Sequence, residues 1–358
     1  MKNFKKNSAF LLLSISLLFS CTNDVSIPLD LRGRVLVLNQ GNYTEHSASI
    51  SLYDERTNEI QNRVYESANG VSIGATLISG VIISENEAAL VCNYPDKIIF
   101  IDPSTAQDKN KTITDGLASP RNMAITENYT YVTNWDYTHE VTPDGTWVFT
   151  DSYIAVYDNQ TGTLQNKVPA GSDAEGIALY GSRLFVAVKE GVAVFSIQGN
   201  TLQKITVIKP AGVEAGARYM TYDAYYRLWV SFPGEGVAEI DPALLTVLSF
   251  TEVPVDSMDG YITTDSYGLN IITYNTIFND QYLPVSAGLY KVNIVTKSVD
   301  QFFTGNYFYG VGVSPFTGDI YTAEVSFTSN SVIKVVSAEG TLINSSTAGV
   351  GTNRYLFF

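Results

Sequence analysis

Aromatic residues that carry a polar atom are concentrated in two segments whose positions suit binding chemistry. The segments Trp135–Asp151 and Tyr274–Ser286 interrupt otherwise regular strand-like runs and hold several Trp, Tyr and Phe residues. Tyr and Trp offer a broad apolar ring together with one hydrogen-bonding atom, so a group of them suits a large, partly apolar ligand. For any single ring, the alternative is packing of the segment onto the body of the protein.

Charged residues form a second set, because they recur at one position of a sequence repeat. Arg121, Arg218 and Arg354 stand just before or at the first strand of three repeat units. Glu175 and Asp259 take the corresponding position in two others. These side chains fit two roles, as hydrogen-bonding groups for a ligand or as mutual ion pairs, and the sequence leaves both open.

Chemistry based on metals or strong nucleophiles has few candidate residues. The chain holds two His, His46 and His139, and two Cys, and it has neither a Gly-x-Ser-x-Gly elbow nor a Gly-rich phosphate loop. We therefore predict no His- or Cys-based metal site, no cofactor, and a protein that is not an enzyme. Carboxylates are common, so a Ca²⁺ site or a sugar-cleaving acid pair stays open.

The elements that must position these residues are short β-strands in a repeat. Val, Ile, Tyr and Phe occur in runs broken by Gly, Asn and Asp, and no long segment shows the helical period. The clearest unit, Gly176 to Val207, has four strands, and a second unit repeats it from Tyr219 to Phe250. First strands start, at the spacing of β-propeller blades, near Ile78, Asn122, Gly176, Tyr219, Tyr261 and Gly310.

The two ends of the repeat predict how the ring closes. The first unit has only three strands, at 35–39, 48–53 and 59–65, while Arg354–Phe358 is a strand without a unit of its own. Placing this last strand innermost in the first blade closes the ring and removes exposed sheet edges. The sequence therefore predicts an all-β fold, a seven-bladed β-propeller with four strands per blade, over residues 34–358.

In such a propeller, the loops from second to third strand share one face with the loops between blades. Both insertions fall on that face, which concentrates aromatic side chains among loops, where function is commonly carried. The predicted ligand-binding residues of this face are Tyr43, His46, Tyr94, Arg121, Trp135, Tyr137, Trp147, Glu175, Arg218, Phe232, Asp259, Tyr274, Phe278, Tyr282, Tyr307 and Tyr309.

The N-terminal segment has the features of a secretory leader. Lysines at positions 2, 5 and 6 precede an apolar run, 9–19, which is shorter than the roughly 20 residues that span a bilayer. Leu18-Phe19-Ser20-Cys21 resembles a bacterial lipobox. We therefore predict a signal peptide over 1–20, lipidation of Cys21 and a tether over 21–33. The other cysteine, Cys92, lies in an apolar run and is predicted to be a buried hydrophobe rather than a reactive thiol.

The charge of the chain limits its partners. It has 22 basic and 36 acidic residues, a net charge of −14. Removing the three lysines of the leader leaves 19 basic residues and a net charge of −17. An acidic surface argues against nucleic acid and against anionic membrane, so contact with the membrane is predicted through the lipid alone.

Two stretches resemble a known family. Leu36–Asn42 followed by Ala48–Asp54 resembles the opening of YncE-like, BtuG-type propeller surface lipoproteins of gut Bacteroidetes, and Ser119–Ile125 leading to Tyr131–Asn134 resembles their repeated blade start. The family's usual Asn-Glu-Gly-Asn reads Asn39-Gln40-Gly41-Asn42 here. The resemblance implies a protein anchored in the outer membrane and facing the cell exterior. It also implies that the protein captures cobalamin and delivers it to a TonB-dependent transporter.

Other functions fit the same face. A ferric siderophore is the second candidate ligand, although an acidic surface fits poorly with strongly anionic cargo. A glycan-binding accessory protein would use the aromatic side chains for stacking on sugar rings. A purely structural surface protein would bind no small molecule. The family resemblance supplies no contact residues, so the site residues named above rest on the geometry of the propeller face.

Overall fold

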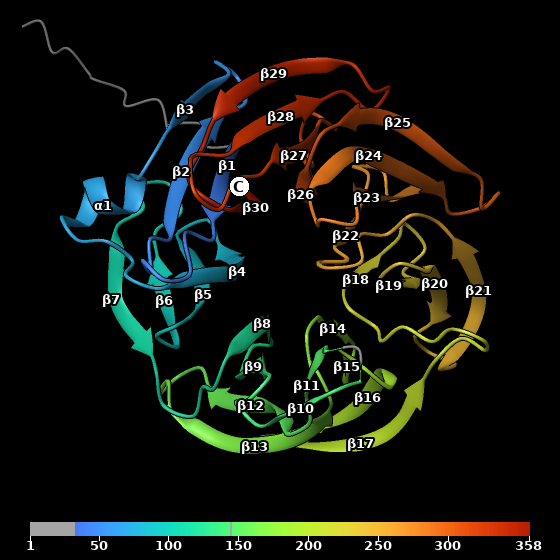
Figure 1. The fold of residues 1–358 in the computed structure, drawn as a ribbon. Helices are drawn as coiled ribbons and strands as arrows, with labels where there is room; N and C mark the ends of the chain where they lie inside the picture. Colours follow the sequence, from blue (N-terminus) through green and yellow to red (C-terminus); the bar gives the residue numbers. More distant parts are fainter. Residues whose placement is uncertain (1–32, 144) are drawn as a thin grey trace, which may run out of the picture. The chain divides into compact units, whose positions relative to one another are not determined.

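The computed structural model describes residues 33–143 and 145–358. Seven sheets, each of four antiparallel strands, stand as blades around a central axis (Figure 1). A further two-stranded sheet, β10 (His139–Val141) with β11 (Trp147–Phe149), belongs to the first insertion. The predicted seven-bladed β-propeller is confirmed.

Within each blade the strands are numbered here from the axis outward. Blades 1 to 4 consist of β30 (Thr352–Phe357), β1 (Arg34–Asn39), β2 (Ser49–Asp54) and β3 (Glu59–Gln61); β4 (Thr76–Ser84), β5 (Glu87–Asn93), β6 (Lys97–Ile101) and β7 (Asp108–Ile113); β8 (Pro120–Ile125), β9 (Tyr129–Asn134), β12 (Ser152–Asp158) and β13 (Leu164–Gly171); and β14 (Ile177–Tyr180), β15 (Arg183–Val188), β16 (Gly191–Gln198) and β17 (Thr201–Ile208). Blades 5 to 7 consist of β18 (Met220–Tyr222), β19 (Leu228–Phe232), β20 (Gly236–Asp241) and β21 (Thr246–Glu252); β22 (Ile262–Thr264), β23 (Asn270–Phe278), β24 (Pro284–Asn293) and β25 (Val299–Gly305); and β26 (Phe308–Val313), β27 (Ile320–Glu324), β28 (Val332–Val336) and β29 (Leu342–Thr347).

The C-terminal strand completes the first blade, as predicted. β30 pairs antiparallel with β1, with Val37 opposite Tyr355 and Leu38 opposite Arg354. The innermost strand of blade 1 therefore comes from the far end of the chain, and the ring is closed by hydrogen bonds between its two ends.

The position of a strand in its blade explains its sequence. The second strands lie between neighbouring blades and are covered on both faces, so β15 is apolar from Leu184 to Val188 without alternation. The outermost strands have one wet face, and β13 accordingly alternates between partly covered and exposed residues over most of its length.

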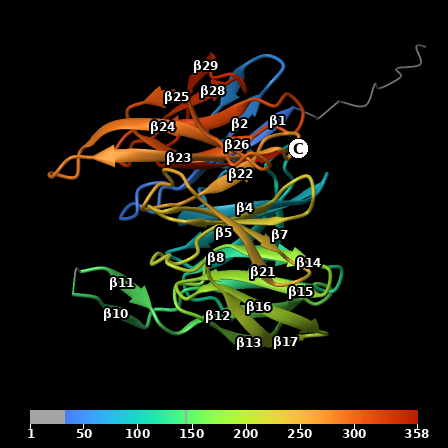
Figure 2. The same ribbon diagram turned by 90° about the vertical axis from the view of Figure 1, so that its right-hand side faces the viewer.

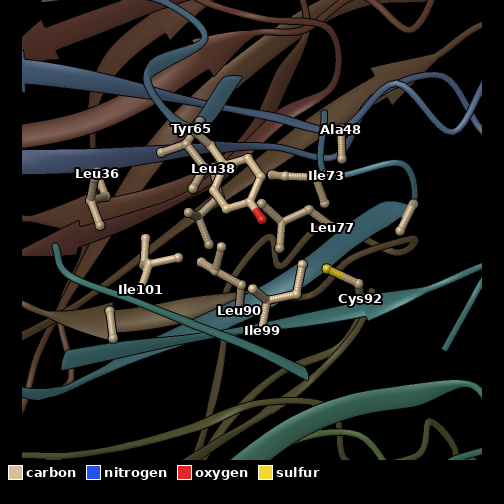
Figure 3. Packing of buried hydrophobic residues seen from close by; sticks show 13 residues of the cluster. Leu36, Leu38, Ala48, Tyr65, Ile73, Leu77, Leu90, Cys92, Ile99 and Ile101 are labelled. Atoms are coloured by element: carbon tan, nitrogen blue, oxygen red, sulfur yellow. The ribbon is translucent and has the colours of Figure 1, made fainter. Parts of the chain in front are cut away.

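Apolar side chains fill the space between neighbouring blades. Between blades 1 and 2, Leu38 of β1 packs with Leu77 of β4 and with Leu90 and Cys92 of β5 (Figure 3). Cys92 has no exposed surface, and burial raises the pKa of its thiol to about 12. The prediction that Cys92 is a small buried hydrophobe is therefore confirmed.

The first unit departs from the sequence prediction at its outer edge. The third strand, expected over 59–65, ends at Gln61, and a short helix, α1 (Val64–Asn69), follows it. The helix buries Tyr65 in the cluster between blades 1 and 2, where the Tyr65 hydroxyl donates to Asp108 at 2.7 Å. Gly70 then ends the helix in the left-handed conformation that glycine accepts readily.

The predicted leader over 1–20, the lipidation of Cys21 and all but the last residue of the tether over 21–33 lie outside the described residues. Among the residues that the structure does describe, no helix has both the length and the hydropathy needed to cross a membrane.

Candidate functional site

Two hairpins project from one side of the propeller. The first is β10–β11, and the second is formed by β23 and β24, whose mutual pairing continues to Phe278 although β22 pairs with β23 only as far as Thr273. Figure 2 shows both hairpins on the same side and the C-terminus on the opposite side. The insertions therefore share one face, as the repeat predicted, and this is called the insertion face.

Trp135 is the centre of an aromatic and cationic cluster on the insertion face. Its ring stacks on that of Phe149 with 4.7 Å between centroids. The guanidinium of Arg121 lies 3.9 Å from the Trp135 ring, and that of Arg218 lies 5.2 Å from it. Cation–π contacts of this kind fix the indole at the base of the first hairpin. Trp147, at the start of β11, stacks on His139 at 4.3 Å and remains largely exposed.

A cavity of about 450 Å³ opens beside this cluster, between the first hairpin and blades 4 and 5. We call it the Trp135 pocket. One wall is aromatic, with Trp135, Trp147 and Phe149, and the other carries the basic side chains of Lys189 and Arg218.

Two donors in this pocket have no acceptor. Neither the Nε1–H of Trp135 nor the Nε–H of Arg218 has a hydrogen-bond partner among the described residues, although both atoms are buried. A buried donor without an acceptor costs about 1–3 kcal/mol. The Trp135 pocket is therefore prepared to accept an oxygen atom.

The charged residues at the blade starts pair with one another around the axis. Glu175 is fully buried and accepts from Arg121 at 3.0 Å and from the Tyr219 hydroxyl at 3.0 Å. Arg218 reaches the same carboxylate only at 3.9 Å. Of the two guanidinium groups near Glu175, Arg218 is thus the less neutralised.

Arg354 forms the second ion pair, across the axis from its own blade. Its guanidinium donates to Asp259 at 2.8 and 3.2 Å and to the Tyr219 hydroxyl at 2.8 Å. Tyr274 donates to the same Asp259 at 2.7 Å. Burial works to raise the pKa of Asp259, but Arg354 outweighs this effect and holds the pKa below its usual value. The ion-pair role is thus realised for Arg121, Glu175, Asp259 and Arg354.

Three tyrosines of blades 1 to 3 meet elsewhere on the face. The ring of Tyr94 lies 4.8 Å from that of Tyr43 and 6.5 Å from that of Tyr137, and all three are partly exposed. The Tyr137 hydroxyl donates to Asp96. His46 is separate from this group and lines a cavity of about 390 Å³ between blades 1 and 7.

The aromatic residues of blades 6 and 7 make contacts of their own. Phe278 packs edge-on against Tyr307 at 5.5 Å. The Tyr309 hydroxyl donates to Gln40 at 3.2 Å. Tyr282, at the tip of the second hairpin, is 86% exposed and has no ring contact among the described residues.

Two of the predicted ligand-binding residues must be corrected. Phe232 and Tyr274 are fully buried and cannot touch a ligand on the face. Both lie within second strands of their blades, where side chains point into the space between blades; Phe232 packs there against Phe250.

The sequence analysis missed three residues of the Trp135 pocket, Asp173, Lys189 and Phe149. Each stands in or next to a loop of the insertion face, so its place in the repeat was the available signal. Residue type was not, since Asp and Lys occur in loops throughout the chain.

Asp173 carries a charge under strain in this pocket. Burial raises the pKa of its carboxyl group, and the backbone N–H of Phe149, which donates to it at 2.8 Å, opposes that effect without cancelling it. A carboxyl group whose pKa is raised by folding stabilises the protein below its unfolded-state pKa and loses that contribution as the pH rises through the folded-state pKa.

We therefore expect Asp173→Asn to be more stable than the wild type at neutral pH, because Asn keeps an acceptor for Phe149 and carries no charge. The advantage should shrink steadily as the pH falls from 7 to 4. Urea unfolding at several pH values measures it. A variant that is less stable than the wild type at pH 7 would show that the charge of Asp173 is stabilising.

Fold and face together define a seven-bladed β-propeller with a loop-built pocket. No protein-family model matches the chain, and comparison with curated proteins also gives no match. Solved structures do match. A putative 6-phosphogluconolactonase from Bacteroides fragilis superposes with a TM-score of 0.63 at 14% identity, over 92% of this chain and 98% of its own.

Two further structures have the same fold. The periplasmic gluconolactonase PpgL of Pseudomonas aeruginosa gives a TM-score of 0.61 at 13% identity and covers 90% of this chain and 98% of its own. Apo AztD from Citrobacter koseri gives 0.58 at 9% identity, over 90% and 96% of the two chains. At these identities the likeness shows the fold alone.

The prediction that the protein is not an enzyme was wrong as a conclusion from these residues. Two of the matching propellers bear the names of lactonases and share nearly the full length of this chain. A propeller without a His- or Cys-based metal site, nucleophile elbow or phosphate loop therefore gives no ground for excluding catalysis.

Proposed function

We propose that this protein binds an organic ligand with an oxygen-rich, anionic group in the Trp135 pocket. The observation that supports the proposal is the pair of unused donors, Trp135 Nε1–H and Arg218 Nε–H, in one cavity. A carboxylate or phosphate oxygen would satisfy both, and hydrogen bonds to charged groups are worth about 1.5–3 kcal/mol.

Local charge supports an anionic ligand in a protein that is acidic overall. Glu175 is held closely by Arg121, so the charge of Arg218 is only partly neutralised, and Lys189 adds a second cation. Trp135, Trp147 and Phe149 supply the apolar surface that most ligand pockets have. Binding would thus combine ring stacking with one strong polar anchor.

The wider role follows from the family resemblance. We propose a lipoprotein anchored through Cys21 in the outer membrane, facing the cell exterior, which captures a scarce nutrient and delivers it to a TonB-dependent transporter. Cobalamin is the first cargo to test, because the resemblance implies it. A ferric siderophore and neutral oligosaccharides are the comparison ligands.

Calorimetry with the chain lacking residues 1–21 tests the proposal. We expect binding heat and thermal stabilisation with the true ligand. Arg218→Gln and Trp135→Phe should each weaken binding by about tenfold, because each removes a donor worth roughly 1–2 kcal/mol while Phe keeps an aromatic ring at position 135. Trp135→Ala combined with Tyr282→Ala should weaken binding further and leave the fold intact.

The matched control is Arg183→Gln, which removes an arginine from the opposite face, where Arg183 donates to the carbonyls of Pro242 and Ala243. Its affinity should equal that of the wild type. Unchanged affinity in both Arg218→Gln and Trp135→Phe would show that the ligand binds elsewhere.

A second function fits the same pocket. Asp173, whose pKa is raised, and Arg218, which has a free donor, both line the cavity. In lactone hydrolysis, Asp173 would take a proton from the attacking water, and Arg218 would stabilise the negative charge on the carbonyl oxygen. The ring C–O bond then breaks and its oxygen takes up the proton, which leaves a hydroxy acid.

Acid release from glucono-δ-lactone, followed by pH-stat titration, tests this second function. The expected result is turnover that Asp173→Asn and Arg218→Gln both reduce by at least tenfold. A rate equal to the spontaneous hydrolysis of the lactone would contradict it.

A further inference from the structure

A larger groove adjoins the Trp135 pocket on the insertion face. It has a volume of about 1270 Å³ and lies between the outer part of blade 5 and the second hairpin, β23–β24. Ser257 and Met258 line both cavities, so the two meet at this loop. We call it the blade 5–6 groove. A ligand that fills the Trp135 pocket can extend into it without leaving the surface.

The groove has the opposite charge to the pocket. Its lining includes the carboxylates of Glu235, Glu252 and Asp280 and no Lys or Arg. None of the three forms an ion pair with a described residue. The pocket next to it carries Lys189 and Arg218. The two cavities together therefore match a ligand with a negative group at one end and a positive group at the other.

One wall of the groove is an open strand edge. Pairing between β22 and β23 ends at Thr273, and the Asp256 loop takes over, since Tyr274 O accepts from Asp256 N–H at 2.8 Å and Thr276 N–H donates to the Asp256 carboxylate at 3.3 Å. Beyond Thr276, β23 continues along the groove with no described strand on that side. Free strand edges pair readily with an extended peptide.

Apolar side chains cover the rest of the groove. Phe250 and Phe278 stand on its two walls, and Met258 and Tyr282 lie at its rim with 67% and 86% of their surface exposed. Exposed large apolar residues around a concave surface are typical of sites that bind another molecule. Such a lining suits the aliphatic side chains of a peptide.

We infer that the ligand of this protein is a short peptide bound across both cavities. The inference rests on the proposed function and names its ligand class. The peptide's carboxyl terminus accepts from Trp135 and Arg218. Its backbone pairs with the free edge of β23. Its amino terminus lies among Glu235, Glu252 and Asp280.

Blocked and unblocked peptides test this inference directly. The probes are peptides of three to eight Ala, Val and Tyr residues, each made with free ends, with an acetylated amino terminus and with an amidated carboxyl terminus. Calorimetry uses the chain from Thr22 onward, which keeps the whole compact unit Leu31–Phe358. We expect the free form to bind best, and each block to weaken binding by about tenfold.

Variants assign each end to its cavity. In Glu252→Gln combined with Asp280→Asn, acetylation should lose most of its effect, while amidation should keep its own. In Arg218→Gln the pattern should reverse. Glu339→Gln is the control, since Glu339 is an exposed carboxylate in the turn between β28 and β29, on the other face.

The outcomes separate this inference from the proposed function. If amidation and Arg218→Gln weaken binding but acetylation has no effect, the Trp135 pocket binds an anion and the two-cavity peptide inference is overturned. If no peptide binds while another organic ligand binds through Arg218, the peptide class is overturned and the proposed function stands. If no ligand of any kind binds, both are wrong.

Discussion

A chain that ends at Gly351 should fail to fold cooperatively. It lacks β30, the only strand that pairs with the inner edge of β1 in the described chain. Tyr355 leaves the apolar cluster between blades 1 and 7, and Asn39 loses the Thr352 hydroxyl that donates to it at 2.6 Å. An opened ring also exposes a long apolar edge, so we expect aggregation.

Circular dichroism and thermal unfolding measure this result. The full chain should unfold in one steep transition, while the shortened chain should show a broad one or none. A chain lengthened beyond Phe358 by a Gly-Ser tail is the control, since it keeps β30 and should unfold like the wild type. A shortened chain with a wild-type transition would mean that blade 1 is stable with three strands.

Arg354→Met should destabilise the propeller by about 3–5 kcal/mol. Asp259 is buried, and its main cationic partner is Arg354, so the variant leaves a charge in a medium that solvates it poorly. The guanidinium also lies 4.1 Å from the Tyr261 ring and 5.0 Å from the Tyr219 ring, and these contacts are lost with it. Urea unfolding gives the free energy of unfolding.

A double variant isolates the ion pair. Asp259→Asn added to Arg354→Met removes the unpaired charge, so the double variant should be clearly more stable than the sum of the two single changes predicts. Strictly additive changes would show that Arg354 acts through packing. A loss below about 1 kcal/mol in the single variant would show that water reaches Asp259 and replaces its partner.

The repeat made the fold predictable. Four strands per unit and a regular spacing of first strands define blades, and the unmatched strand at Arg354–Phe358 defines the closure. Helix α1 escaped prediction because it is a single short turn inside the connection between two blades. Its Val64 and Tyr65 suit a strand equally well by residue type, and burial of Tyr65 against blade 2 decides the outcome.

The candidate site was predictable in position and not in detail. Propeller topology places Trp135 and Arg218 on one face, so the sequence could name them together. Whether Arg218 is paired depends on a difference between 3.0 and 3.9 Å at Glu175, which no pattern of residue types records. Phe232 looked available because it precedes a loop, yet its side chain points between blades. Asp173 drew no attention because only its burial makes it unusual.

The two ends of the propeller have a practical consequence. Arg34 and Phe358 exchange backbone hydrogen bonds at 3.1 and 3.3 Å, on the side away from both hairpins (Figure 2). A tag or fluorophore attached after Phe358 therefore leaves the pocket and groove free. Coupled to a sensor chip through that end, every molecule would present its hairpins to the flowing solution in one orientation. A small, rigid disc of this kind is a convenient capture reagent.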